Sequence, residues 1–145
     1  MKIALLNGPN LNMMGERDPG MYGTTTLAQV ETACEKLCKE HGFELDFFQS
    51  NHEGALVDKV QESRDAAAII INPGAYSHTS IALRDALEII SAPIIEVHVS
   101  NIYSRENFRR HSYITEVATG VVAGLGTTGY RLAIDAAAEL IAKNK

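Results

Sequence analysis

The chain has 145 residues, of which 46% are hydrophobic and 21% charged, a composition that excludes disordered, fibrous and disulfide-knotted classes. A domain of this length buries roughly 68–70% of the surface that its unfolded chain exposes, so it needs no disulfide to fold. The formal net charge of −5 disfavours nucleic acid and anionic membranes as partners, because both require a basic surface. A small acidic substrate remains compatible, since a local cationic pocket can hold it.

No segment approaches the run of about 18 apolar residues that a membrane helix needs. Residues 1–7 are too short for the apolar region of a signal peptide and lead directly into Gly8-Pro9. We therefore expect a cytoplasmic protein. The two cysteines, Cys34 and Cys38, fall on one expected helix, and we interpret them as small buried hydrophobic side chains.

Short apolar runs alternate with helical patterns along the whole chain. The runs predicted to be strands are Lys2–Asn7, Phe43–Gln49, Ala67–Ile71, Ile94–Val99 and Val117–Ala123. Three of them are continuously apolar at their centres, which is typical of strands covered on both faces in a parallel sheet. The alternation predicts a doubly wound α/β fold, an open five-stranded parallel sheet of flavodoxin-like order 2-1-3-4-5 with helices on both faces. Residues 1–145 are expected to form a single domain.

Apolar residues between these runs recur at helical spacing. The first helix opens with a capping box, in which Gln29 follows Thr26 by three positions, and it stops where Gly42 follows His41. A weaker pattern predicts a helix over Gly54–Arg64. The third and last helices carry the apolar series Leu83–Ile90 and Ala133–Leu140.

Ligands of open α/β sheets bind outside the carboxyl ends of the strands, in the loops that follow them. The first such loop, Gly8–Thr25, has 18 residues, where 2–6 are usual, and we interpret it as a lid or binding loop. Asn72 to His78 follow the third predicted strand. On the fourth, Glu96, His98 and Ser100 point to one side, because side chains alternate along a strand.

The polar residues of these loops also have purely structural interpretations. Asn72 could be only a turn former before a Pro-Gly pair, and Tyr22, in the long first loop, could be an aromatic side chain packed on the core. Arg109 could belong to a solvated basic turn or form a carboxylate-binding fork. His98 is harder to explain structurally, because a half-paired imidazole on a buried strand costs free energy unless Glu96 or a ligand satisfies it.

Several common chemistries lack their motifs. The sequence has no G-x-S-x-G elbow, no P-loop and no H-x-x-x-H, and no lysine ends a predicted strand, which disfavours Schiff-base catalysis. Gly124–Gly129 matches the dinucleotide pattern G-x-G-x-x-G, but only 16 residues follow it. A dinucleotide site needs a further strand with an acidic residue about 20 positions on. We therefore interpret the glycines as a tight strand-to-helix turn.

The remaining polar groups suit proton transfer without a cofactor, which needs a base, a stabilised enolate and an acid. Tyrosine is a poor base at its ordinary pKa near 10, but an adjacent guanidinium favours the phenolate and lowers that pKa. Arg17 could therefore activate Tyr22. His98 would be the acid, oriented by Glu96.

Five segments of the chain carry specific motifs in a fixed order. They are N-G-P-N-L-N-M-M-G-E-R-D-P-G-M-Y-G at 7–23, Q-S-N-H-E-G at 49–54, N-P-G-A-Y-S-H-T-S at 72–80, E-V-H-V-S-N at 96–101 and R-E-N-F-R-R-H-S at 105–112. Together they resemble the type II 3-dehydroquinate dehydratase family over almost the whole chain. The resemblance implies a flavodoxin-like fold, a dodecamer built as a tetramer of trimers, and no metal or cofactor. It also implies reversible trans-dehydration of 3-dehydroquinate to 3-dehydroshikimate through an enolate, in the shikimate or quinate pathway.

The same resemblance implies a role for each matching catalytic residue. Tyr22 is expected to take the proton beside the ketone, while Arg17 lowers its pKa and stabilises the enolate. His98, supported by Glu96, is expected to protonate the departing hydroxyl. Asn10 is expected to help position a water at the enolate oxygen.

The residues matching the family's substrate-binding positions are Asn72, His78, Arg109, Val99 and Ser100. The first three are expected to hold hydroxyls of the substrate, and the last two its carboxylate, through their backbone amides and the Ser100 hydroxyl. Asp85 lies seven residues beyond His78, about 10 Å along a helix at 1.5 Å per residue. It is either a solvated residue beside Arg84 or, as in the family, a contribution to the pocket of a neighbouring subunit.

Two other classes of function stay open on the sequence. One is a flavodoxin-like module that binds a small anion or nucleotide through Gly124–Gly129 without catalysis. The other is a metal hydrolase that uses His78, Glu96 and His98.

Overall fold

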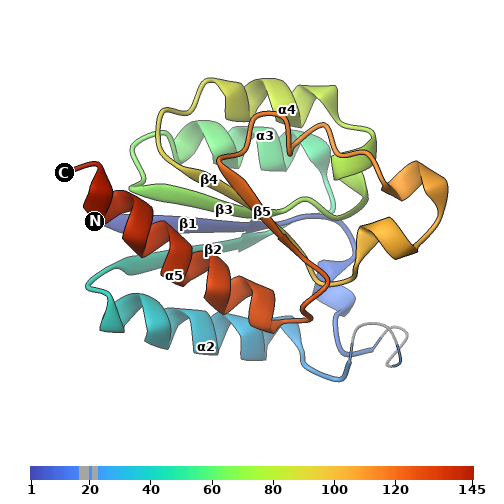
Figure 1. The fold of residues 1–145 in the computed structure, drawn as a ribbon, viewed down its shortest axis with the longest axis horizontal. Helices are drawn as coiled ribbons and strands as arrows, with labels where there is room; N and C mark the ends of the chain where they lie inside the picture. The colour runs from blue at the N-terminus through green and yellow to red at the C-terminus, as the bar shows by residue number, and fades with distance from the viewer. Residues whose placement is uncertain (17–19, 21–22) are drawn as a thin grey trace.

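The computed structural model describes residues 1–16, residue 20 and residues 23–145, so Arg17 and Tyr22 lie outside the described residues. Within this part of the chain, five parallel strands form one sheet of order β2-β1-β3-β4-β5 (Figure 1). The strands are β1 (Lys2–Asn7), β2 (Glu44–Gln49), β3 (Ala68–Asn72), β4 (Ile94–His98) and β5 (Gly120–Ala123). The predicted fold class and strand order are confirmed.

In the described part of the chain, four α-helices of eight or more residues connect and cover the strands. They are α2 (Leu27–Glu40), α3 (Glu53–Glu62), α4 (Ile81–Glu88) and α5 (Thr128–Lys143). The predicted capping box opens α2, because the Thr26 hydroxyl accepts from the Gln29 N–H and the Gln29 side chain accepts from the Thr26 N–H. After α2, Gly42 takes a left-handed φ of 83°, as expected for a helix stop. Among the described residues no helix is both long enough and apolar enough to cross a membrane.

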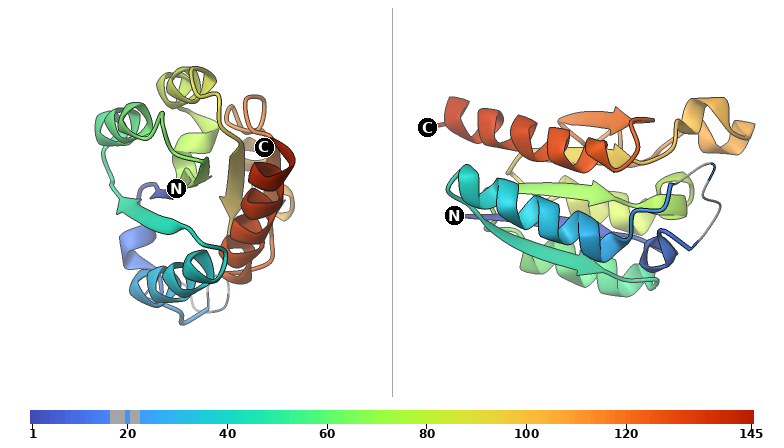
Figure 2. Two further views of the ribbon diagram at one scale, coloured as in Figure 1. Left: turned by 90° about the vertical axis from the view of Figure 1, so that its left-hand side faces the viewer. Right: turned by 90° about the horizontal axis from the view of Figure 1, so that it is seen from below.

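The helices form two layers, with α2 and α5 on one face of the sheet and α3 and α4 on the other (Figures 1 and 2). Alternation along β1 supplies both cores: Ile3 and Leu5 pack with α2 and α5, whereas Ala4 and Leu6 pack with α3 and α4. Buried residues fill β3 and β4 completely, so the prediction of strands covered on both faces is confirmed.

The fifth strand is shorter than predicted. The sequence predicted Val117–Ala123, but β5 begins at Gly120. Val117 and Ala118 instead form a turn in which both N–H groups donate to the carbonyl of Ile114, each at 3.0 Å. These residues are apolar because they pack against the core under α3 and α4, and this burial imitates a strand in the sequence pattern.

Both cysteines are fully buried on the α2 face that packs against α5, as predicted. Burial raises the pKa of the Cys34 thiol to about 12 and that of Cys38 to about 11. The thiols therefore stay protonated near neutral pH, which suits a packing role.

All strands run in one direction, so their carboxyl ends gather at one end of the molecule, opposite the two termini (Figure 1). The segment Gly124–Gly129 joins β5 to α5 at this end, and the turn predicted there is confirmed. Gly124 has a φ of 85° and Gly126 a φ of 62°, and the Gly126 N–H donates to the carbonyl of Val99 at 3.0 Å. The turn thus packs against the end of β4.

Candidate active site

A pocket opens at the carboxyl ends of β1, β3 and β4, where the fold predicts a site. Seven of the predicted site residues line it: Asn10, Asn72, His78, His98, Val99, Ser100 and Arg109. Its other lining residues include Arg105, Leu11, Gly74 and Ile102. The described lining therefore combines two guanidinium groups, two imidazoles and two amides, a set that suits a polar, anionic ligand.

The start of the loop after β1 reaches this pocket because Gly8 lets its backbone pack closely against the backbone of Asn72 and Pro73. The Gly8 N–H donates to the carbonyl of Asn72 at 2.8 Å, and a Cβ at Gly8 would lie only 2.3 Å from the carbonyl oxygen of Pro73. Asn10 then adopts a left-handed φ of 69°, which asparagine tolerates better than most residues. Its N–H donates to Asn51 Oδ1 at 3.0 Å, so its backbone is anchored beside the pocket.

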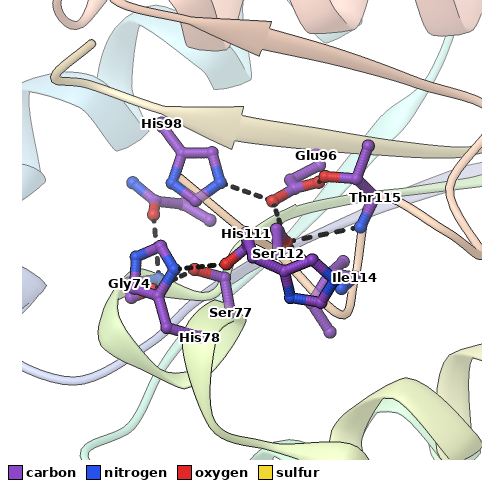
Figure 3. Close-up of polar contacts among 10 residues, drawn as sticks. Gly74, Ser77, His78, Glu96, His98, His111, Ser112, Ile114 and Thr115 are labelled. Atoms are coloured by element: carbon purple, nitrogen blue, oxygen red, sulfur yellow. Dashed lines mark hydrogen bonds and ion pairs between the residues drawn. The ribbon is translucent and has the colours of Figure 1, made fainter. Parts of the chain in front are cut away.

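His98 and Glu96 form a buried pair on β4 (Figure 3). The ring Nε2 contacts Glu96 Oε2, and the same carboxylate accepts from the hydroxyls of Ser112, at 2.7 Å, and Thr115. Burial alone would raise the pKa of Glu96. The hydrogen bond and charge of His98 and the two hydroxyls outweigh it, so the pKa lies below its ordinary value. Glu96 is therefore an ionised partner for the imidazole.

The contact with Glu96 leaves the other ring nitrogen of His98 for the pocket. No described residue provides His98 Nδ1 with a hydrogen-bond partner, although the residue is only 4% exposed and lines the pocket. A protonated imidazole donates from both nitrogens. The pair can thus hold one N–H on Glu96 and offer the other to a ligand.

His78 lies beside His98, with ring centroids 6.4 Å apart, but its environment favours the neutral form. Burial lowers the pKa of His78, and the nearby charges of His98 and Arg109 lower it further, against the raising effect of its bond to His111. His78 Nδ1 lies 2.7 Å from the carbonyl oxygen of His111, which can only accept, so Nδ1 carries the proton. In the neutral ring Nε2 is then an acceptor, suited to a hydroxyl.

Two arginines stand at the pocket from the segment after β4. Arg109 Nε donates to Glu106 Oε2 at 2.6 Å, and Arg105 Nη1 donates to Ser100 Oγ at 3.4 Å. The sequence predicted Arg109 but not Arg105 as a site residue. The signal for Arg105 was its place four residues before Arg109 in the same basic turn.

Asn72 is fixed from two sides at the end of β3. Its Oδ1 accepts from the Gly74 N–H at 3.1 Å, as in the predicted Pro-Gly turn, while its Nδ2 donates to the hydroxyl of Tyr130 at 2.8 Å. The turn-forming and pocket-lining interpretations of Asn72 therefore both hold. Tyr130 was not predicted, because nothing near it in the sequence indicates a contact with β3.

Two predicted residues lie away from the pocket surface. Glu96 is fully buried behind His98, as a supporting role requires. Asp85 is exposed on α4 and does not line the pocket, and its neighbour Arg84 instead pairs with Glu116 at 3.2 Å. The predicted contacts of Arg17 and Tyr22 concern residues outside those that the structure describes.

The two alternative functions gain no support from this geometry. Among the described residues, no group of three or more His, Cys, Asp or Glu side chains is placed to hold a metal ion. His78 uses its Nδ1 on a carbonyl, and Glu96 has its oxygens occupied by His98 and two hydroxyls. Gly124–Gly129 does not line the pocket.

Comparison with known proteins gives a consistent match. The family model described as dehydroquinase class II matches residues 1–138. The chain is 53% identical over 138 residues to catabolic 3-dehydroquinase 2 of Aspergillus flavus, covering 94% of this chain and 92% of that protein. It is 54% identical over 133 residues to a 3-dehydroquinate dehydratase of Cereibacter sphaeroides, covering 91% and 90%. The crystal structure of type II dehydroquinase from Butyrivibrio crossotus superposes with a TM-score of 0.92 at 44% identity, covering 94% and 97%.

Proposed function

The chain belongs to the class II dehydroquinase family, and from that premise we propose that it catalyses the reversible trans-dehydration of 3-dehydroquinate to 3-dehydroshikimate. The reaction removes a proton from the carbon beside the ketone and a hydroxyl from the next carbon, through an enolate. The observation that carries the proposal is the His98–Glu96 pair, because it places a carboxylate-supported imidazole in the pocket. The step belongs to the shikimate or quinate pathway.

His98 is the general acid in this proposal. Ionised Glu96 stabilises the imidazolium through Nε2, and Nδ1 can then donate its proton to the departing hydroxyl, which leaves as water. The electron pair of the enolate forms the new carbon–carbon double bond as the carbon–oxygen bond breaks. Because both residues are buried, water screens the electrostatic attraction between them only weakly.

Tyr22 is the base, and Arg17 favours its phenolate and stabilises the enolate; these two assignments rest on the family motif at positions 7–23. The phenolate accepts the proton from carbon, and Asn10 helps position a water at the enolate oxygen. Tyr22→Phe should lower kcat by several orders of magnitude with little change in substrate affinity. A turnover rate near that of the parent protein would remove Tyr22 from this role.

Substrate binding uses the polar lining of the pocket. His78 accepts from a substrate hydroxyl through Nε2, while Asn72 and Arg109 hold further hydroxyls. The backbone amides of Val99 and Ser100, with the Ser100 hydroxyl, bind the carboxylate. The positive charge of the two arginines supports the binding of an anionic substrate by a chain whose net charge is −5.

The active form is proposed to be a dodecamer, a tetramer of trimers, in which Asp85 completes a neighbouring subunit's pocket. The exposure of Asp85 on α4, away from its own pocket, supports this assignment. Activity would then depend on assembly.

Formation of the product tests the function directly. 3-Dehydroshikimate is a conjugated enone and absorbs ultraviolet light, so adding 3-dehydroquinate to the purified protein should give a steady rise in absorbance. Saturable binding of 3-dehydroquinate with no rise would instead identify a binding module without catalysis. A rise that a chelator abolishes would show that the reaction depends on a metal ion, contrary to the cofactor-free chemistry proposed here.

A further inference from the structure

A hydroxyl that no role above uses lies beneath the pocket. Tyr130, on the first turn of α5, is fully buried, and its Oη is 2.7 Å from Asn7 Oδ1 and 2.8 Å from Asn72 Nδ2. Asn7 and Asn72 are direct partners in the β1–β3 register, at the last positions of their strands. The phenol therefore joins the ends of two strands to α5 at the edge that forms the pocket.

Backbone atoms fix the hydrogen-bond directions among Asn7, Tyr130 and Asn72, at the Asn7 end and at the Asn72 end. Asn7 Nδ2 donates to the carbonyl of Phe48 at 3.3 Å, which leaves Asn7 Oδ1 as an acceptor for the Tyr130 hydroxyl. At the other end the Gly74 N–H donates to Asn72 Oδ1, so Asn72 Nδ2 faces the phenol oxygen as a donor. Tyr130 can thus donate to one asparagine and accept from the other at the same time.

This chain of bonds determines what Asn72 offers to the pocket. Its carbonyl oxygen is held by the Gly74 N–H and one amide hydrogen by Tyr130, and the other amide hydrogen has no partner among the described residues. Because Asn72 lines the pocket and is only 3% exposed, a ligand is the natural acceptor for that hydrogen. Rotation of the amide would leave buried donors and acceptors unpaired, which is costly.

We propose that Tyr130 is a positioning residue for the dehydration, holding the Asn72 amide so that its free N–H binds a hydroxyl of the substrate. The inference rests on the proposed function and extends it to a residue that does not line the pocket. The hydroxyl keeps its proton over the working pH range, because burial raises the pKa of Tyr130 above its ordinary value, against the lowering effect of the Asn72 hydrogen bond.

Tyr130→Phe removes only the hydroxyl. The bond between Asn72 and the substrate is present in both the ground state and the transition state, so its loss raises KM and leaves kcat nearly unchanged. We expect KM for 3-dehydroquinate to rise about 2- to 13-fold, the range for one neutral hydrogen bond, with kcat within about twofold of the parent. A lower melting temperature with an unchanged KM would mean that Tyr130 is merely structural.

Two comparisons separate positioning from general destabilisation. Ser63→Ala removes a buried hydroxyl that donates to the Lys59 carbonyl at 2.8 Å beyond the end of α3, and it should lower stability without changing KM. In an Asn72→Ala background, Tyr130→Phe should have no further effect on KM. The same increase in both backgrounds would show that Tyr130 does not act through Asn72.

A measurement without turnover keeps this inference distinct from the proposed function. By NMR, one side-chain amide hydrogen of Asn72 should exchange slowly with solvent in the parent protein and at least about tenfold faster in Tyr130→Phe. Fast exchange in the parent contradicts the positioning role even if the variant does not fold. If the parent does not convert 3-dehydroquinate but the exchange difference is found, the proposed function fails while the hold of Tyr130 on Asn72 stands.

Discussion

Thr115→Val removes one of the two hydroxyls that hold Glu96 and keeps the shape of the side chain. Glu96 is fully buried, and Thr115 donates to its Oε1. A hydrogen bond to a charged group contributes about 1.5–3 kcal/mol. Because a change of about 2–4 °C accompanies each kcal/mol in a domain of this size, the melting temperature should fall by roughly 3–12 °C at pH 7.

The pH dependence of this loss identifies its origin. The folded pKa of Glu96 is depressed, so the stability it contributes is present above the unfolded pKa and is lost as the pH falls through the folded pKa. The parent and Thr115→Val should therefore differ in free energy of unfolding at pH 7 and converge in acid. The acid limb of kcat/KM should also move to higher pH in the variant, by about 1–2 pH units.

Urea unfolding at one protein concentration, repeated from pH 7 downward, measures the difference. Thr119→Val is a matched control, because the Thr119 hydroxyl accepts from the Ile94 N–H at the opposite end of β4 and touches no carboxylate. Its cost should not change with pH. If Thr115→Val shows the same pH-independent loss, the proposed ionised state of Glu96 is wrong.

Three further predictions concern packing and assembly. Gly8→Ala should destabilise the protein by about 1–3 kcal/mol and lower kcat/KM, because the Cβ of the alanine would meet the Pro73 carbonyl. The control Gly54→Ala on α3 should be tolerated, because nothing lies within 4 Å of a Cβ at that position. Equal unfolding midpoints of the two variants would refute the close approach of Gly8 to Pro73. Both buried cysteines should resist a thiol reagent at pH 8 until denaturant is added, and rapid labelling of the folded protein would contradict their raised pKa values. Asp85→Ala should lower kcat/KM about tenfold or more, whereas Glu88→Ala, at an exposed position on the same helix, should not. A protein that sediments as a monomer and is fully active would exclude the role of Asp85 in a neighbouring subunit's pocket.

The sequence predicted most of the fold because local patterns and burial agree there. The apolar runs of β1 to β4, the capping box at Thr26 and the stop at Gly42 each correspond to elements found within a residue or two. The prediction failed at Val117, where apolar residues of a turn pack into the core and mimic a strand. Periodicity reports burial, and it does not separate a buried turn from a short strand.

The site was predictable where its residues stand together in the chain. Alternation on β4 placed Glu96 and His98 on one side, and the structure joins them. The contacts of Glu96 with Thr115 and of Asn72 with Tyr130 span 19 and 58 positions, and no local pattern encodes them. Long-range partners of this kind become visible only once the sheet brings the segments together.

Turnover by His98→Ala is the most direct test of the proposed chemistry. In the ultraviolet assay of enone formation, we predict that the variant loses several orders of magnitude in kcat relative to the parent, because the proton donor at Nδ1 is lost. A kcat equal to that of the parent would contradict the assignment of His98 as the acid and, with it, the role of the buried pair on β4.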